Sequence, residues 1–320
     1  MDEYLAERRR RAVSPDPYLG SQLKKHVLGD DEFASIELAK LREHHFDAWR
    51  SRLPIREDGD DRSKATIGRS TFNRVANDLR ASLNAAARRY RRELPAQIAA
   101  EIAAGTRALP VSSETARMQI LSDKQVAAVV RAAFDPSVDI EGDFGRLVAV
   151  LAATGARFSQ VARIRVGDVD VKRQRVFVPA SAKGRTRKSK PAAAVPIDKA
   201  VVELLRPAMR GRAADAPLLA RWSYRKGTRI EWVKDKRGSW SDAHQMDGLW
   251  HRTVAIAKVP TDTIPYALRH SSIVRALRAG VPLRIVAANH DTSTAMIERH
   301  YGRFISEAGD DLARAGSLRL

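Results

Sequence analysis

The feature that most restricts the fold of this chain is the segment of residues 264–301, where helix-breaking residues separate three short helical stretches. Intervals of three or four predict one face of the first helix, formed by Ala267, His270, Val274 and Leu277. Thr263 and Pro265 stand where a cap and a first helical residue are favoured. Gly280 ends this helix and Pro282 prevents its continuation.

Two further helices complete the segment. The second ends at the turn of residues 289–291, which reads Asn-His-Asp. Thr292 or Ser293 caps the third helix, which runs to Tyr301. The segment therefore places arginine, histidine and tyrosine side chains on helices and turns that are close in the sequence.

The net charge restricts the partners of the chain. There are 57 Lys and Arg residues against 38 Asp and Glu, which gives a net charge of +19 and a pI near 10.6. Nucleic acid is the favoured partner, because phosphate contacts by Lys and Arg release counterions. A solvated basic surface, a ribosome-associated protein and a membrane-surface protein are the alternatives that charge alone leaves open.

Composition excludes several other classes. The 320 residues suffice for one large or two medium domains, and a hydrophobic content of 44% permits a packed core. No apolar run approaches the roughly 18 residues of a membrane helix, and the first residues lack the apolar core of a signal peptide. The absence of cysteine excludes disulfides and thiolate metal sites. We expect a cytoplasmic, nucleoid-associated protein that needs no metal or other cofactor and has no membrane contact.

The first part of the chain predicts a basic helical domain. Residues 32–53 have helical spacing, and apolar residues at intervals of three or four predict a long helix from Thr71 to Tyr90. The polar side of that helix either faces DNA or is solvated. We predict that Arg69, Arg74 and Arg80 on this side bind DNA. The run Arg8–Arg11 is a solvated tail or a flexible basic arm.

A change of composition over residues 105–118, which contain Gly, Pro and consecutive Ser, marks a domain boundary. We expect domains at 1–112 and 113–320. The second domain opens with a capping-box pattern, Ser122 followed by Gln125.

The second domain contains one predicted strand hairpin among helices. A helix stops at Gly155, so that Arg157 begins a fresh short helix. Strands at Arg175–Pro179 and Ala193–Ile197 flank a long basic loop. A helix at 198–212, an irregular stretch from 217 and a helix near 245–258 complete the prediction.

Taken in order, these motifs resemble a known family. The order TGAR, a hairpin with a lysine, YALRH, NHD and a late tyrosine is similar to the catalytic domain of the tyrosine recombinases, the phage integrase family. The similarity covers roughly residues 118–305, and residues 70–86 resemble the helical core-binding domain of that family. The resemblance implies a mainly α fold with a small β-sheet (α+β), in which a SAM-like helical domain precedes the catalytic domain.

The resemblance also implies a chemistry. Tyr301 matches the nucleophile that cuts one DNA strand, keeps a 3′-phosphotyrosyl bond and releases a 5′-hydroxyl, so that rejoining needs no ATP. Arg157 and Arg269 match the pair that clamps the phosphate, and their forked side chains suit bidentate contacts. Lys183 matches the general acid, with Lys188 or Lys190 as alternatives, and His290 matches a donor to the scissile phosphate.

Each of these residues also has an ordinary structural interpretation. Tyr301 fits a half-buried tyrosine at a helix end, and either arginine alone fits a surface salt bridge. His290 fits a histidine that caps its own turn with Asp291. The assignment therefore depends on the ordered set of motifs.

The sequence departs from the family pattern at several positions. Tyr266 stands where the family usually has histidine, and a phenol is a poor base near neutral pH. This departure predicts either slower cleavage or another group in the role. Gln160 replaces an acidic residue, Ala288 and Asn289 replace Leu-Gly before the histidine, and Asp168 fits a structural acid.

The resemblance implies a site-specific DNA recombinase or integrase of a phage or other mobile element. Its partner would be double-stranded DNA, contacted in the hairpin loop by Arg185, Arg187 and Lys188. Family members act as homotetramers on two duplexes, with or without accessory proteins, and each passes a C-terminal helix to a neighbour. In this chain, residues 304–320 either form that helix or pack on their own domain. The alternatives are a type IB topoisomerase, a catalytically weak DNA-binding relative and an RNA-binding structural protein.

Overall fold

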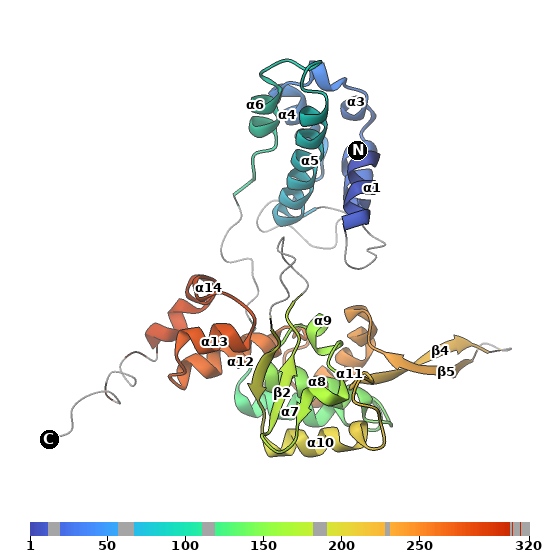
Figure 1. The fold of residues 1–320 in the computed structure, drawn as a ribbon, viewed down its shortest axis with the longest axis vertical. Coiled ribbons are helices and arrows are strands. Elements are labelled where there is room, and N and C mark those ends of the chain that lie inside the picture. Colours follow the sequence, from blue (N-terminus) through green and yellow to red (C-terminus); the bar gives the residue numbers. More distant parts are fainter. Residues whose placement is uncertain are drawn as a thin grey trace. The chain divides into compact units, whose positions relative to one another are not determined.

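The computed structural model describes residues 1–11, 20–56, 67–110, 119–181, 191–227 and 231–307, together with residues 309 and 314. The chain divides into two compact units, Met1–Arg117 and Met118–Leu320, here called unit one and unit two (Figure 1). The predicted boundary between residues 112 and 113 lies outside the described residues. Among the described helices, none is long and apolar enough to cross a membrane.

The described secondary structure of unit one is helical, apart from an isolated bridge between Ile55 and Ile67. Its helices are α1 (Asp2–Arg11), α2 (Ser21–Leu23), α3 (Asp31–Ala34), α4 (Glu43–Arg52), α5 (Arg69–Arg89) and α6 (Ile98–Gly105). A π-helical turn spans Lys24–Leu28 and a 3-10 turn spans Leu38–Lys40. The long helix predicted for Thr71–Tyr90 is confirmed as α5. The helical spacing over 32–53 resolves into α3, the 3-10 turn and α4, because Leu41 and Arg42 have extended backbone conformations.

The core of unit one is built on three aromatic side chains. Phe46, Trp49 and Phe72 are all completely buried, and the rings of Trp49 and Phe72 lie 5.7 Å apart. The Trp49 indole N–H donates to the carbonyl of His26 at 2.7 Å, so its polar group is satisfied inside the core. Residues that are distant in sequence are therefore fixed around α5.

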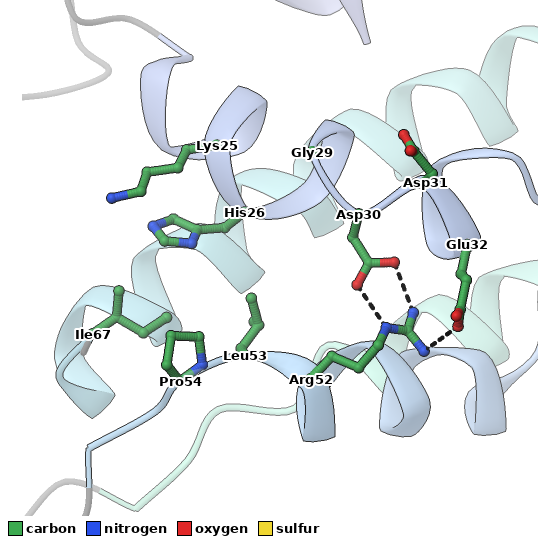
Figure 2. Close-up of a pocket in the computed structure, with 10 residues that line it drawn as sticks. All are labelled: Lys25, His26, Gly29, Asp30, Asp31, Glu32, Arg52, Leu53, Pro54 and Ile67. Carbon is green, nitrogen blue, oxygen red and sulfur yellow. Dashed lines mark hydrogen bonds and ion pairs between the residues drawn. The ribbon is translucent and has the colours of Figure 1, made fainter. Parts of the chain in front are cut away.

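A cavity of about 650 Å³ lies beside this core, between the Lys24–Leu28 turn and the end of α4 (Figure 2). Arg52 closes one side of it with two hydrogen bonds to the Asp30 carboxylate, at 2.7 and 2.8 Å, and an ion pair to Glu32 at 2.7 Å. Asp30 also caps α3 by accepting from the backbone N–H of Phe33. The hydrogen bonds from Arg52 lower the pKa of Asp30, so the charges of these two side chains are paired with each other within unit one.

Unit two combines helices with two small antiparallel sheets. Its helices are α7 (Asp123–Ala133), α8 (Asp143–Thr154), α9 (Phe158–Val161), α10 (Lys199–Met209), α11 (Asp247–Ala257), α12 (Ala267–Arg278), α13 (Leu283–Asn289) and α14 (Thr294–Glu307). One sheet has the order β1 (Val169–Asp170), β2 (Arg175–Val178), β3 (Ala193–Pro196), and the other pairs β4 (Ala220–Lys226) with β5 (Trp232–Ser239). The predicted fold class, mainly α with a small sheet, is confirmed.

Helix α8 is the centre of unit two. It is buried along nearly its whole length and contacts α7, α10 and α12. The predicted capping box at Ser122 and Gln125 begins α7, and the predicted hairpin is formed by β2 and β3. Because Gly155 ends α8 in the left-handed conformation, the chain turns at once into Arg157 and α9.

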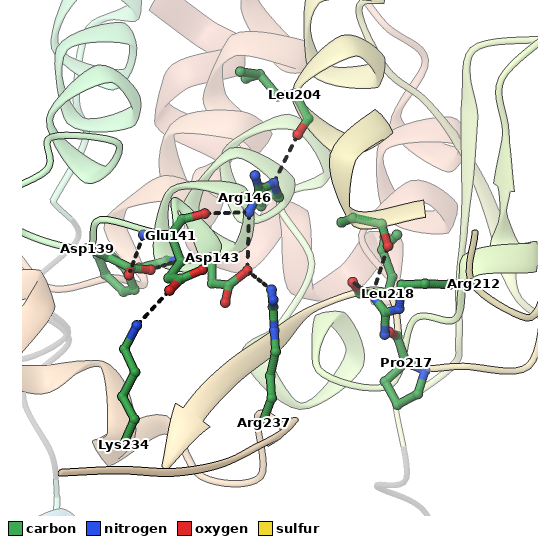
Figure 3. A network of polar contacts seen from close by, with 12 residues as sticks. Asp139, Glu141, Asp143, Arg146, Leu204, Arg212, Pro217, Leu218, Lys234 and Arg237 are labelled. Atoms are coloured by element: carbon green, nitrogen blue, oxygen red, sulfur yellow. Dashed lines mark hydrogen bonds and ion pairs between the residues drawn. The ribbon is translucent and has the colours of Figure 1, made fainter. Parts of the chain in front are cut away.

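The prediction of an irregular stretch from residue 217 is wrong, because β4 and β5 form a hairpin there that extends from the helices of unit two (Figure 1). Most side chains of these strands are exposed, so no apolar alternation marks them. The base of the hairpin is held by ion pairs: Arg237 bonds the buried carboxylate of Asp143, which also accepts from Arg146 at 3.1 Å (Figure 3). Lys234 pairs with Glu141 at 2.6 Å.

Candidate active site

Helix α12 carries the residue to which the candidate site is anchored, Arg269. Its side chain is only 4% exposed. One terminal nitrogen donates to the carbonyl of Gly155 at 2.9 Å and the other donates to the carbonyl of His290 at 2.7 Å. Arg269 therefore joins α12 to the end of α8 and to the turn after α13.

Gly155 permits this close approach. Its φ of +59° lies in the left-handed region that favours glycine. A Cβ at this position would lie 2.7 Å from His290 Nε2 and 2.7 Å from Ser272 Oγ, closer than real contacts allow. The glycine that ends α8 thus also makes room for two side chains of the site.

Arg157 lies on the other side of this turn, as the half-buried cap of α9. Its Nη1 donates to the carbonyl of Asp291 at 3.1 Å and lies 3.8 Å from the Asp291 carboxylate. Burial lowers the pKa of the Arg269 guanidinium, Tyr266 opposes this change, and the positive charge of Arg157 lowers that pKa further. The two predicted clamp arginines are therefore close enough to repel each other, and an anion would relieve that repulsion.

His290 is buried in the turn after α13. Its Nδ1 lies 2.8 Å from the Val286 carbonyl, which can only accept, so this nitrogen carries the proton. Its Nε2 lies 3.0 Å from the Ser272 hydroxyl, which then donates. Burial lowers the pKa of His290 to about 4, so the ring is neutral near pH 7. The alternative in which His290 caps its turn with Asp291 is not the arrangement seen, and a donor role toward phosphate stays a prediction.

Tyr301 lies within α14, which continues to Glu307 rather than ending at the tyrosine. Its side chain is 6% exposed, and its hydroxyl lies 2.7 Å from His270 Nδ1. Burial raises the pKa of Tyr301 to about 12, while the charges of Arg269 and Arg157 lower it. The phenol and both guanidiniums therefore act on one another electrostatically in a single chain.

Tyr266, the predicted replacement for the family histidine, precedes α12 and is 43% exposed. Its ring meets the His270 ring edge-on, with centroids 5.0 Å apart. The Arg269 guanidinium carbon lies 6.0 Å from the centre of the Tyr266 ring. Tyr266 is thus adjacent to the site, with its ring against an imidazole.

The predicted general acid cannot be placed, because Lys183 and its alternatives Lys188 and Lys190 lie outside the described residues. The predicted DNA contacts Arg185 and Arg187 lie outside them too. The end of β2 that leads into this loop is nevertheless fixed beside the site, since the Ser181 N–H donates to the Asp291 carboxylate at 2.8 Å. Gln160 donates to the same carboxylate at 3.3 Å and to the Pro179 carbonyl at 2.8 Å.

The predicted DNA contacts of unit one have different surroundings. Arg74 is exposed on α5. Arg80 bonds the hydroxyl of Thr106 at 2.7 Å and the Thr106 carbonyl, so it ties α5 to the end of α6. Arg69 donates to the Pro110 carbonyl at 3.4 Å. DNA contact by these three arginines stays a prediction, and Arg80 also has a structural role.

Sequence reasoning missed two residues of this site. His270 directly follows Arg269 in the motif LRH, but spacing along α12 marks it only as a member of the face shared with Ala267, Val274 and Leu277. Asp291 was considered only as a partner of His290, whereas it joins Arg157, Gln160 and Ser181. Within the described residues, no group of three or more His, Asp or Glu side chains is placed to hold a metal ion.

Comparison with known proteins gives the class of the molecule. The phage integrase family profile matches residues 120–303, more than half of the chain. No curated protein matches the sequence significantly. The chain belongs to the phage integrase family.

Solved structures agree with this assignment at the level of fold. The Tn1549 transposon integrase in complex with transposon right end DNA has a TM-score of 0.64 at 13% identity, over 98% of this chain and 99% of that one. A lambda integrase dimer bound to a COC' core site has a TM-score of 0.55 at 15% identity, over 92% and 94% of the two chains. The lambda integrase tetramer bound to a Holliday junction has a TM-score of 0.55 at 14% identity, over 91% of this chain and 73% of that one.

Proposed function

We propose that this chain is a site-specific DNA recombinase that cleaves and rejoins DNA strands through a 3′-phosphotyrosyl intermediate. The observation that carries the proposal is the position of the Tyr301 hydroxyl, where the charges of Arg269 and Arg157 act against the burial that raises its pKa to about 12. In a member of this family, a buried phenol that feels the charges of two guanidiniums supports a nucleophile and a phosphate site within one chain.

The chemistry follows from these positions. The Tyr301 oxygen attacks the scissile phosphorus and expels the 5′-oxygen of the next nucleotide. Charge grows on the non-bridging oxygens in the transition state, where the forked donors of Arg157 and Arg269 stabilise it. Lys183 is the proposed donor of the proton that the 5′-oxygen needs, and the 5′-hydroxyl reverses the reaction when strands are rejoined.

Double-stranded DNA is the proposed partner. The net charge of +19 favours a polyanion, and both structural relatives described above were solved with DNA. By analogy with the lambda integrase tetramer on a Holliday junction, we propose four copies of this chain on two duplexes. Mass photometry of the protein with and without its selected duplex tests this assembly, and a complex no larger than one chain per site would contradict it.

The test of the chemistry is covalent trapping. A duplex first selected from a random pool is incubated with the protein, quenched with detergent and resolved on a denaturing gel. The wild-type chain should give a DNA-linked band that protease removes, and Tyr301→Phe should give none. Tyr224→Phe, which removes an exposed hydroxyl from β4, is the matched control and should retain the band.

The same gel separates this function from its alternatives. Binding of the selected duplex without any adduct would indicate a non-catalytic DNA-binding relative. An adduct on every sequence, with relaxation of supercoiled DNA and no strand exchange, would indicate a topoisomerase of type IB. Sequence-dependent adducts that resolve into exchanged strands support recombination.

A further inference from the structure

Resting on the function proposed above, a second residue of α12 has a place in the reaction. We propose that His270 is the general base that removes the proton from the Tyr301 hydroxyl. The role is needed because Tyr266 replaces the histidine expected three residues before Arg269. The structure offers another imidazole one residue after that arginine, already in contact with the reacting atom.

The geometry of the contact supports proton transfer. His270 Nδ1 lies 2.7 Å from the Tyr301 oxygen, within the range of a strong hydrogen bond. The two rings are 5.7 Å apart at their centroids and tilted by 44°. A general base must reach the proton that it abstracts, and this one does so before any substrate arrives.

The imidazole is present in the form that a base requires. Burial, with smaller contributions from Arg269 and His300, lowers the pKa of His270 to about 4. The ring is therefore neutral near pH 7. With the proton on Nε2, the lone pair of Nδ1 accepts the hydrogen bond from the phenol.

Every described titratable group that faces His270 is consistent with this assignment. Arg269 precedes it on α12, Tyr266 packs edge-on against its ring, and Tyr301 and His300 come from α14. Among these groups, Arg269 is a cation, and burial raises the pKa of Tyr301 to about 12, so its phenol keeps its proton at neutral pH unless a base acts on it. His270 is the group that directs a nitrogen lone pair at the phenol oxygen, from Nδ1.

The step balances in protons and bonds. The Oη–H proton of Tyr301 moves to His270 Nδ1 while the Oη–P bond forms and the P–O5′ bond breaks, and the departing 5′-oxygen takes its proton from the proposed general acid. The imidazolium that results lies beside the new phosphodiester anion. On rejoining, the 5′-hydroxyl gives its proton back to that acid and attacks, the P–O5′ bond forms while the Oη–P bond breaks, and His270 returns the proton to the phenol.

Adduct kinetics test the role. His270→Gln keeps a hydrogen-bond acceptor for the phenol and removes the base, so adduct formation on the selected duplex should slow by about 10²–10⁴-fold. Its rate should rise about tenfold per pH unit above pH 7, because hydroxide must then supply the base, whereas the wild-type rate should be nearly flat. His251→Gln, an exposed histidine on α11, should behave as wild type.

A second measurement needs no DNA. Nitrogen NMR of the free protein reports the tautomer of His270, and the Nε2–H form is expected at pH 7. The Nδ1–H form would make His270 a donor to the phenol and would overturn the proposal. Equal adduct rates for wild type and His270→Gln would also overturn it, whereas a wild-type chain that gives no adduct on any duplex would remove the proposed function itself.

Discussion

Replacing Gly155 by alanine tests whether the turn after α8 makes room for the site. The left-handed backbone at φ +59° costs about 1–2 kcal/mol for a residue with a Cβ. The new methyl group would also lie 2.7 Å from His290 Nε2 and Ser272 Oγ, so their hydrogen bond must break or move. Loss of that buried bond adds about 1–2 kcal/mol. Gly155→Ala should therefore lower the free energy of unfolding of unit two by about 2–4 kcal/mol.

Two other glycines separate these contributions. Gly211 has a φ of +69° with nothing within 4 Å of a Cβ, so Gly211→Ala measures the backbone cost alone. Gly248 lies in α11 with open space around it, so Gly248→Ala should be neutral or stabilising by up to about 1 kcal/mol. Urea unfolding followed by tryptophan fluorescence gives all three values. A loss for Gly155→Ala no larger than that for Gly211→Ala would refute the claim that the turn shapes the site.

Two further predictions concern charge. The pKa values of His270 and His290 are both lowered to about 4 in folded unit two, whereas both histidines take up a proton near pH 6.5 in the unfolded chain. The free energy of unfolding should therefore be full above about pH 6.5 and fall by about 1.4 kcal/mol per pH unit for each histidine as the pH drops toward 4. Urea midpoints that do not change with pH over this window would contradict this prediction. Arg237→Ala should destabilise unit two by about 1–3 kcal/mol, because Arg237 offsets the cost of burying the Asp143 carboxylate. Burial raises the pKa of that carboxyl group. Lys236→Ala on the same strand is the control, and equal unfolding midpoints for the two variants would exclude this role of Arg237.

Local sequence signals predicted much of unit two because their causes are local. The capping box at Ser122, the left-handed stop at Gly155 and the start of a new helix at Arg157 depend on neighbouring residues. The same holds for the β2–β3 hairpin, whose inward-facing valines alternate with exposed residues. These features place Arg157 at the start of α9 from sequence alone, and its role as a phosphate clamp stays a prediction.

Contacts between distant segments could not be predicted in the same way. The β4–β5 hairpin has no apolar alternation, and its base depends on the pairing of Arg237 with Asp143, which are far apart in sequence. The contact of His270 with Tyr301 joins α12 to α14, so spacing along α12 could only mark His270 as a face residue. Family resemblance did not identify it either, because the expected base position is Tyr266.

The pKa values of the proposed nucleophile and its proposed base would keep the free chain from reacting before DNA binds. Tyr301 has a pKa of about 12 and His270 of about 4, so complete proton transfer between them before DNA binds would cost on the order of 10 kcal/mol. A phosphate held by Arg157 and Arg269 changes this balance, since its negative charge stabilises an imidazolium while the forming Oη–P bond removes charge from the phenol oxygen. In the proposed mechanism, proton transfer is therefore concerted with attack on phosphorus, and Tyr301 stays protonated until a phosphodiester is in place.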